Sequence, residues 1–221
     1  MVKLLENTFR AVNIGLVNEI ALMCDRLGLN VWEIIGAAAT KPFGYMPFYP
    51  GPGIGGHCIP LDPHYLSWKL KTLNFYARFI ELAGEINEGM PYYVLAKIQR
   101  LLNQHGHCLN GSEVLVLGVT YKADVADWRE TPAIKVMELL QREKAKLVYA
   151  DPFTPSVEIE GRPYTAVEVT DERLRRCACV VILTAHSAFD YERIVKLAPV
   201  VFDTRNGTRN VKGKKDNVVL L

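Results

Sequence analysis

The first 105 residues repeat apolar side chains at the three- and four-residue spacing of amphipathic helices. The first predicted helix covers residues 1–28, and Gly28 can end it in the left-handed conformation. Its apolar positions are Leu4, Leu5, Phe9, Val12, Leu16, Ile20 and Met23. Asn30 and Glu33 have the spacing of a capping box, which predicts a second helix to about residue 39. Further helices are predicted at residues 62–71, at 75–89 and, restarting at Pro91, to about residue 104.

From residue 113 onward the pattern changes to short, continuous apolar runs rich in β-branched side chains. Strands are predicted at residues 114–119, 146–150, 179–184 and 200–203, and helices between them at 131–141, 172–177 and 188–197. Strands that are buried on both faces and alternate with helices indicate a parallel, doubly wound sheet. The sequence therefore predicts an α/β protein, with an all-helical domain at residues 1–105 and a sheet domain at residues 106–221.

A loop between the second and third predicted helices is too rich in glycine and proline for regular structure. In residues 49–63, four glycines and four prolines surround Cys58, and Asp62 follows four residues later. A rigid loop that carries one nucleophile indicates a reaction centre open to substrate. A tight structural loop around a small apolar cysteine explains the same composition.

The same loop contains the spacing of a dinucleotide-binding fingerprint. Gly51, Gly53 and Gly56 match G-x-G-x-x-G. That fingerprint needs an apolar strand before it and a helix directly after it, so that the pyrophosphate meets a helix N-terminus. Neither is predicted here, and we therefore expect no dinucleotide cradle at this position.

Polar residues cluster at two other places. On the first helix, Lys3 and Asn7 lie one turn apart on one face, which a solvated surface explains. After the first strand, Lys122 and Arg129 stand among carboxylates, and Arg205 follows the last predicted strand. Cations at strand ends suit a phosphate ligand, although a salt-bridged surface loop is equally consistent.

Composition excludes several classes of protein. The chain has 221 residues, 49% hydrophobic and 23% charged, and a net charge of +2 that favours neither nucleic acid nor a membrane surface. No apolar run approaches the roughly 18 residues that span a bilayer, and no secretory signal opens the chain. Five cysteines form no metal pattern, which favours a reducing cytoplasm. The segment from His105 to Cys108 lacks a second ligand pair, so we predict a turn and no metal site.

Together these motifs resemble the UDP-glucose/GDP-mannose dehydrogenase family. The resemblance runs from Lys3 to about Asn206, with the motifs in family order. The sequence around Cys58 is most similar to that of the UDP-N-acetylglucosamine 6-dehydrogenase branch. The matching pieces are Lys3-x-x-x-Asn7-x-Phe9, Asn18-Glu19, the glycine loop through Cys58 to Asp62, and the segments 118–130, 149–152 and 202–205.

The resemblance implies an enzyme in three parts. These are an N-terminal NAD-binding Rossmann domain, a helical middle that forms a homodimer through its long helix, and a C-terminal Rossmann-like domain that binds the UDP portion of a UDP-sugar. This chain starts inside a helical pattern without a cap, where the family's central helix starts. We therefore expect the main NAD-binding domain to be absent from it, and the chain alone to be inactive.

The implied reaction is an NAD-dependent oxidation of a sugar C6 alcohol to a carboxylate. Cys58 would form a thiohemiacetal and then a thioester. Lys3 and Asn7 would stabilise the oxyanion, and Asp62 would order or deprotonate the hydrolytic water.

Further roles also follow from the resemblance. Tyr49, Gly55, Tyr121, Lys122 and Arg205 are expected to contact the substrate. An NAD contact is expected from Arg129. UDP-N-acetylglucosamine is the preferred substrate.

Several alternatives remain open. UDP-glucose or UDP-N-acetylmannosamine could be the substrate, and the chain could be an inactive assembly module. In many UDP-glucose enzymes of the family an arginine from the partner subunit precedes the glycine loop. Here Pro42 occupies that position beside Lys41, which leaves open whether Lys41 replaces it. A cysteine hydrolase that uses Cys58 with His57 or His186 is a rival from another class.

Overall fold

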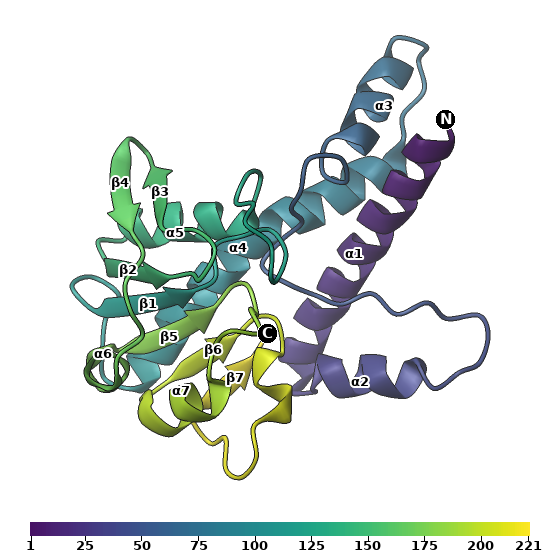
Figure 1. Cartoon of the computed structure of the whole chain (residues 1–221). Helices are drawn as coiled ribbons and strands as arrows, with labels where there is room; N and C mark the ends of the chain where they lie inside the picture. Colours follow the sequence, from purple (N-terminus) through teal and green to yellow (C-terminus); the bar gives the residue numbers. More distant parts are fainter. The chain divides into compact units, whose positions relative to one another are not determined.

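The computed structural model describes all 221 residues, as two compact units (Figure 1). The first unit is Met1–Met90 and the second is Pro91–Leu221. Helix α4 (Arg78–Gln104) contributes residues to both. The domain boundary between residues 105 and 106 therefore stays a prediction.

The first unit is helical, as predicted. It contains α1 (Val2–Leu27), α2 (Val31–Ala38), α3 (Asp62–Lys71) and the first half of α4. Gly28 ends α1 at a φ of 68°. Asn30 caps α2, because its side chain accepts the Trp32 N–H at 3.0 Å and donates to the Glu33 carboxylate at 3.0 Å.

The predicted break at Pro91 is wrong, since α4 runs through it as one helix. A proline inside a helix removes one backbone hydrogen bond and crowds the preceding turn. Here the flanking side chains of Met90 and Val94 are fully buried. Burial of apolar surface on both sides of the proline outweighs the lost bond, which the local pattern could not show.

The buried side of α1 is not its apolar stripe. Its buried residues are mostly small or polar and are Asn7, Gly15, Val17, Asn18, Ala21 and Cys24. Gly15 permits a close approach to α4, because a Cβ at that position would lie 3.1 Å from the Ala83 Cα. Leu5, Leu16 and Met23, which belong to the periodic apolar pattern, are 68%, 54% and 46% exposed.

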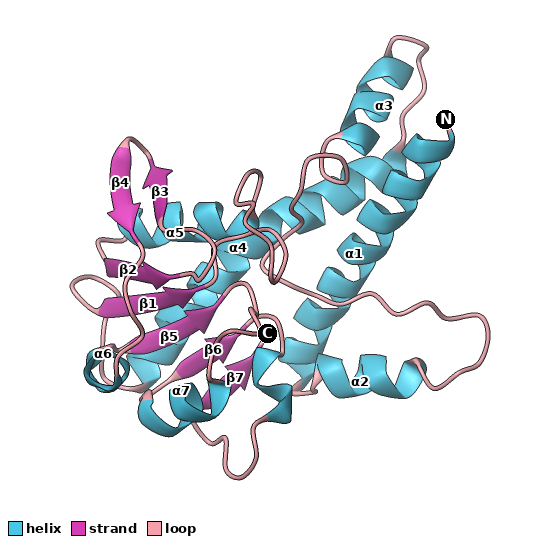
Figure 2. Cartoon of the chain, in the orientation of Figure 1, coloured by secondary structure: helices cyan, strands magenta, loops and turns pink.

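The second unit contains the predicted parallel sheet (Figure 2). Its strands are β1 (Glu113–Leu117), β2 (Lys146–Ala150), β5 (Cys179–Ile182), β6 (Val201–Asp203) and β7 (Val218–Leu220). Their order is β2-β1-β5-β6-β7, and every pair is parallel. In register, Leu117 of β1 is paired with Ala150 of β2 and with Ile182 of β5.

Helices cover the sheet as a doubly wound fold requires, which confirms the predicted class. Helices α6 (Asp171–Arg176) and α7 (Tyr191–Leu197) lie on one face, where Leu174 and Ile194 pack with Leu115 and Ile182. Helix α5 (Pro132–Arg142) lies on the opposite face (Figure 1).

Three short elements were not predicted, because each is too short for a periodic pattern. They are the antiparallel hairpin of β3 (Ser156–Ile159) and β4 (Arg162–Thr165), the edge strand β7, and a 3₁₀ turn, η1 (Gly207–Asn210). No helix of the structure has both the length and the apolar character needed to cross a membrane.

The order of the strands locates a ligand crevice. From β1 the chain turns first to β2 on one side, and later returns to β5 on the other side. Ligands of doubly wound sheets bind outside the carboxyl ends of the strands at such a reversal. The loops to inspect are therefore residues 118–130 after β1 and residues 183–190 after β5.

Candidate active site

The glycine-rich loop of the first unit is tied to the helices behind it. The Gly51 N–H donates to Asn18 Oδ1 on α1 at 3.0 Å, and Asn18 Nδ2 donates to Asn87 Oδ1 on α4 at 2.8 Å. Further along the loop, the Cys58 side chain is exposed, and the Cys58 carbonyl accepts the Asp62 N–H at 2.8 Å. One end of the loop is thus anchored in the helix pair, and Cys58 lies one turn before α3.

Three of the predicted catalytic residues converge beside this cysteine. Asp62 Oδ2 accepts from Asn7 Nδ2 at 2.7 Å and forms an ion pair with Lys3 Nζ at 3.1 Å. The hydrogen bond from Lys3, with further help from Asn7, holds the pKa of the Asp62 carboxyl below its usual value. The bond to Asp62 and its charge, followed by the charge of Cys58, raise the pKa of Lys3. Lys3 and Asp62 are therefore both ionised near neutral pH, and Lys3 lies within electrostatic reach of the Cys58 side chain.

This arrangement contains both donors and an acceptor for acyl chemistry. An ammonium has three N–H donors and a primary amide has two, and the contacts to Asp62 use one of each. Lys3 and Asn7 therefore keep donors for a developing oxyanion. Asp62 keeps its second carboxylate oxygen as an acceptor for water.

Tyr49 and Gly55 lie in the same loop as Cys58. Tyr49 is 58% exposed, and its ring stacks on Trp32 with centroids 6.1 Å apart. Gly55 is half-buried. Their contact with substrate stays a prediction.

The second unit has a cavity of about 840 Å³ at the carboxyl ends of its strands. Tyr121, Lys122 and Arg205 line it together, although they are far apart in sequence. Arg209 from η1, which the sequence analysis did not select, adds another cation to the lining. The position and charge suit a phosphorylated ligand.

Arg205 is the cation that the fold fixes most firmly in this cavity. Its Nε donates to the Leu183 carbonyl at 3.1 Å, and its backbone N–H donates to Asp203 Oδ1 at 3.0 Å. Burial lowers the pKa of Arg205 to about 10, against the opposing charge of Asp203. A phosphate bound to the planar fork would offset that burial, so this guanidinium favours an anionic ligand.

Arg129 does not line this cavity. Its Nε and its terminal nitrogen donate to the two carboxylate oxygens of Asp127, each at 3.0 Å, and its side chain is 68% exposed. The bond to Asp127 raises its pKa. The structure thus shows Arg129 in a surface ion pair, and its contact with NAD stays a prediction.

Neither unit by itself forms a cradle for a dinucleotide. The segment after Gly51 is irregular, with no strand before it. In the sheet domain, β1 is followed by one glycine, Gly118, and by a loop that reaches α5 only at Pro132. A pyrophosphate cradle needs a glycine-rich turn that leads directly into a helix N-terminus. The residues of this chain do not fit that requirement.

Two other expectations concern histidines. The segment after α4 forms the predicted turn, in which His105 Nδ1 bonds to the Leu101 carbonyl at 2.8 Å and Cys108 Sγ to the Asn110 carbonyl. His186 is fully buried with both ring nitrogens hydrogen-bonded. It is therefore unsuited to act as the base of a cysteine hydrolase.

The two units and their candidate sites indicate two domains of a nucleotide-sugar dehydrogenase family. Family comparison agrees, and the chain belongs to the UDP-glucose/GDP-mannose dehydrogenase family, whose members are NAD-dependent. Residues 1–89 match the central domain of that family, and residues 115–210 match its UDP binding domain. The family's NAD-binding domain is not among the matches.

Individual relatives are more specific. A UDP-N-acetyl-D-mannosamine dehydrogenase of Methanococcus maripaludis is 37% identical over 214 residues, which are 93% of this chain and 47% of the relative. A solved structure of a UDP-D-ManNAc dehydrogenase from Pyrococcus horikoshii matches with a TM-score of 0.82 at 32% identity, over 100% of this chain and 50% of that one. This chain spans about half the length of the relatives it matches.

These relatives do not support the expected UDP-N-acetylglucosamine branch. A UDP-N-acetyl-D-glucosamine 6-dehydrogenase of Salmonella typhi is 33% identical over 187 residues, 85% of this chain and 43% of the relative. The match to the mannosamine enzyme is longer and more identical. The expected branch, which was assigned from the loop around Cys58, is therefore corrected in favour of the UDP-N-acetylmannosamine dehydrogenases. The sequence of one loop does not distinguish two sugars that differ at one carbon.

Proposed function

We propose that this chain is the substrate-binding and dimerising half of an NAD-dependent UDP-sugar 6-dehydrogenase, and that its sugar is N-acetylmannosamine. The observation that carries the proposal is the convergence of Lys3, Asn7 and Asp62 beside the exposed Cys58. The choice of sugar rests on the names of the relatives at 36–38% identity.

The groups of the first unit suit the two steps on either side of an oxidation. In the first step the Cys58 thiolate adds to a C6 aldehyde, which forms a C–S bond and leaves negative charge on the aldehyde oxygen. Lys3 and Asn7 would donate to that oxygen. After oxidation to the thioester, a water held by Asp62 would add to the carbonyl carbon, release the carboxylate and return the thiol. The residues of this chain form no dinucleotide cradle for NAD, which is the hydride acceptor of the family.

The cavity of the second unit suits the UDP portion. Arg205, Lys122 and Arg209 offer positive charge to a diphosphate, and Tyr121 offers a ring and a hydroxyl. UDP-sugar binding therefore needs only this chain, whereas turnover needs a cofactor site as well. We expect binding without NADH production by the chain alone.

A calorimetric titration with a panel of ligands tests the proposal. UDP and UDP-N-acetylmannosamine should bind, UDP-N-acetylglucosamine and UDP-glucose should bind more weakly, and GDP serves as the matched control. Arg205→Ala should weaken UDP by about tenfold or more, since a charge-assisted bidentate contact is lost. Equal affinity for UDP and GDP would refute the proposed ligand class. Equal affinity across the UDP-sugars would refute only the choice of sugar.

A homodimer through α1 is part of the same proposal. Leu5, Leu16 and Met23 leave an exposed apolar stripe along a 26-residue helix. A groove of about 420 Å³ lies on the same helix, lined by Leu5, Glu6, Phe9 and Arg10. An apolar stripe at helical spacing suits packing against a second helix.

A further inference from the structure

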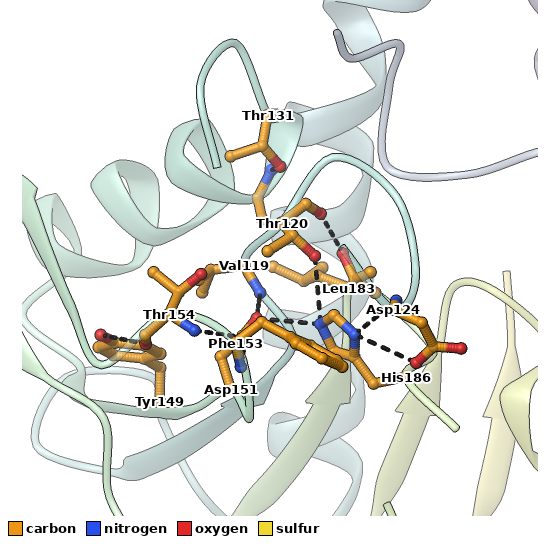
Figure 3. Close-up of polar contacts among 12 residues, drawn as sticks. Val119, Thr120, Asp124, Thr131, Tyr149, Asp151, Phe153, Thr154, Leu183 and His186 are labelled. Carbon is orange, nitrogen blue, oxygen red and sulfur yellow. Dashed lines mark hydrogen bonds and ion pairs between the residues drawn. The ribbon is translucent and has the colours of Figure 1, made fainter. Parts of the chain in front are cut away.

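A buried polar cluster, whose contacts are drawn in Figure 3, lies beside the cavity of the second unit. The proposed chemistry gives it no role. Its centre is the pair of His186, which is 0% exposed, and Asp151, which is 8% exposed. Asp151 directly follows β2, and His186 lies in the loop after β5. Phe153 and Phe189 lie against the imidazole, with ring centroids 5.0 and 5.7 Å away.

The hydrogen bonds determine which ring nitrogen carries the hydrogen. The Asp124 backbone N–H donates to His186 Nδ1 at 3.0 Å, so Nδ1 is an acceptor. Nε2 therefore carries the hydrogen and donates to Asp151 Oδ2 at 3.0 Å. Thr120 Oγ1 lies 3.2 Å from the same nitrogen, and it can accept there because its own hydrogen is given to the Lys122 carbonyl at 2.8 Å.

Asp151 has a matching set of donors. Its Oδ2 also accepts the Val119 N–H at 2.7 Å, and its Oδ1 accepts the N–H groups of Phe153 at 2.8 Å and Thr154 at 3.0 Å. A carboxylate with this many donors is held in one orientation. Asp151 thereby fixes the imidazole, just as a carboxylate fixes the tautomer of other buried histidines.

The bond from His186 reaches the loop that forms one wall of the cavity. Tyr121 and Lys122 of that loop line the cavity, and they lie between Thr120 and Asp124, the two residues that His186 contacts. Asp124 is held in the left-handed region at a φ of 61°, and its Oδ1 accepts the Ser187 N–H at 2.8 Å. The loop is therefore fastened at both ends to the segment after β5.

We propose that His186, as the Nε2–H tautomer held by Asp151, is a positioning residue that fixes Tyr121 and Lys122 for binding of a nucleoside diphosphate. The inference rests on the proposed function for its ligand, although the bonds that carry it do not involve a ligand. His186 does not act on the ligand itself, because both of its ring nitrogens are used within the protein.

Two amide substitutions separate the two bonds of the ring. In His186→Asn, the side-chain oxygen can take the place of Nδ1 and accept the Asp124 N–H, while the bond to Asp151 is lost. In His186→Gln, the longer side chain can take the place of Nε2 and donate to Asp151, while the Asp124 N–H loses its partner. UDP affinity should fall by about threefold in the first variant, which keeps the bond to the cavity loop at Asp124, and by about tenfold or more in the second, which loses that bond.

A merely structural role of His186 would not make His186→Gln lose more UDP affinity than His186→Asn. Thr170→Ala is the matched control, because it removes the N-cap of α6 and should lower the melting temperature without changing UDP affinity. The proposal is overturned if the two His186 variants lose affinity equally, or if affinity follows melting temperature across all three.

The wild-type protein gives a test that needs neither a ligand nor a variant. Long-range ¹H–¹⁵N correlation spectra of the His186 ring at neutral pH should show hydrogen on Nε2 and none on Nδ1, and the Asp124 amide should exchange slowly with solvent. Hydrogen on Nδ1, or fast exchange of that amide, would overturn the proposal. If wild-type protein fails to bind UDP but passes this test, the proposed function fails and the positioning of the loop stands.

Discussion

Asn18 of α1 and Asn87 of α4 form a direct side-chain hydrogen bond of 2.8 Å in the interior of the helical unit. Each amide also binds backbone, because Asn18 Oδ1 accepts the Gly51 N–H at 3.0 Å and Asn87 Nδ2 donates to the Ala11 carbonyl at 3.3 Å. The pair thus joins two helices to the loop that carries Cys58. A buried polar network of this kind stabilises the fold only if all its members are satisfied.

Removal of one amide should therefore cost more than a single hydrogen bond. Asn18→Ala leaves the Gly51 N–H and Asn87 Oδ1 without partners in a buried site. We expect the free energy of unfolding to fall by about 2–4 kcal/mol. Asn13→Ala is the control on the same helix, because Asn13 is half-buried and makes one exposed hydrogen bond, to the Phe9 carbonyl at 2.7 Å. It should change the free energy of unfolding by about 0.5 kcal/mol or less. Urea unfolding of the two variants measures the difference, and similar losses would contradict the role of the network.

The sequence predicted most of the regular structure but not the contacts that this network makes. The runs around Val114, Lys146 and Cys179 were recognised as strands because buried parallel strands are continuously apolar. Asn18 was noticed only as part of a family motif. Its partner Asn87 lies 69 residues away, a pairing that no local pattern contains.

The candidate site shows the same division. Cys58 could be selected from one loop as a candidate nucleophile, since it is a lone cysteine among glycines and prolines. Arg209 was missed as part of the cavity, because the 3₁₀ turn after β6 brings it there. A signal was available in its position after a predicted strand, where doubly wound sheets bind ligands.

Gly118 should be among the least replaceable residues of the sheet domain. Its φ is +80°, and a Cβ there would lie 2.3 Å from the Thr184 carbonyl oxygen. Gly118→Ala should therefore lower the free energy of unfolding by more than about 3 kcal/mol, because steric overlap is added to backbone strain. Gly111 has a φ of +81°, and a Cβ there would have no atom within 4 Å. Gly111→Ala therefore isolates the backbone strain and should lower the free energy of unfolding by about 1–2 kcal/mol. Equal losses in urea unfolding would show that the contact with Thr184 has no cost.

Asp151 should make the stability of the sheet domain depend on pH in the acidic range. Burial acts to raise the pKa of its carboxyl, but the bonds from His186, Val119 and Phe153 outweigh burial and hold it below the ordinary value of 3.8. The Asp151 carboxyl therefore binds a proton more tightly in the unfolded chain than in the folded one. Its contribution to the free energy of unfolding is fully present above the pKa of the unfolded chain. That contribution is lost as the pH falls through the lower pKa of the folded chain.

The difference in unfolding free energy between wild type and Asp151→Asn should accordingly shrink as the pH is lowered from 5 toward 3. Asp216→Asn is the control, since the Asp216 side chain is 82% exposed, and its difference from wild type should stay near zero. A difference for Asp151→Asn that stays constant with pH would contradict the lowered pKa.

The exposed stripe of α1 should determine the oligomeric state. Leu16 and Met23 are seven residues apart, two helical turns on one face, and burial of such a side chain contributes about 1.5–3 kcal/mol. The double variant Leu16→Lys/Met23→Lys places two charges in the proposed interface. Light scattering after size exclusion should give twice the 24.9 kDa chain mass for the wild type and a single chain mass for this variant. Leu73→Lys, at a residue 69% exposed beyond α3, should leave the dimer intact. A wild-type monomer would refute the dimer, and equal dissociation by both variants would place the interface elsewhere.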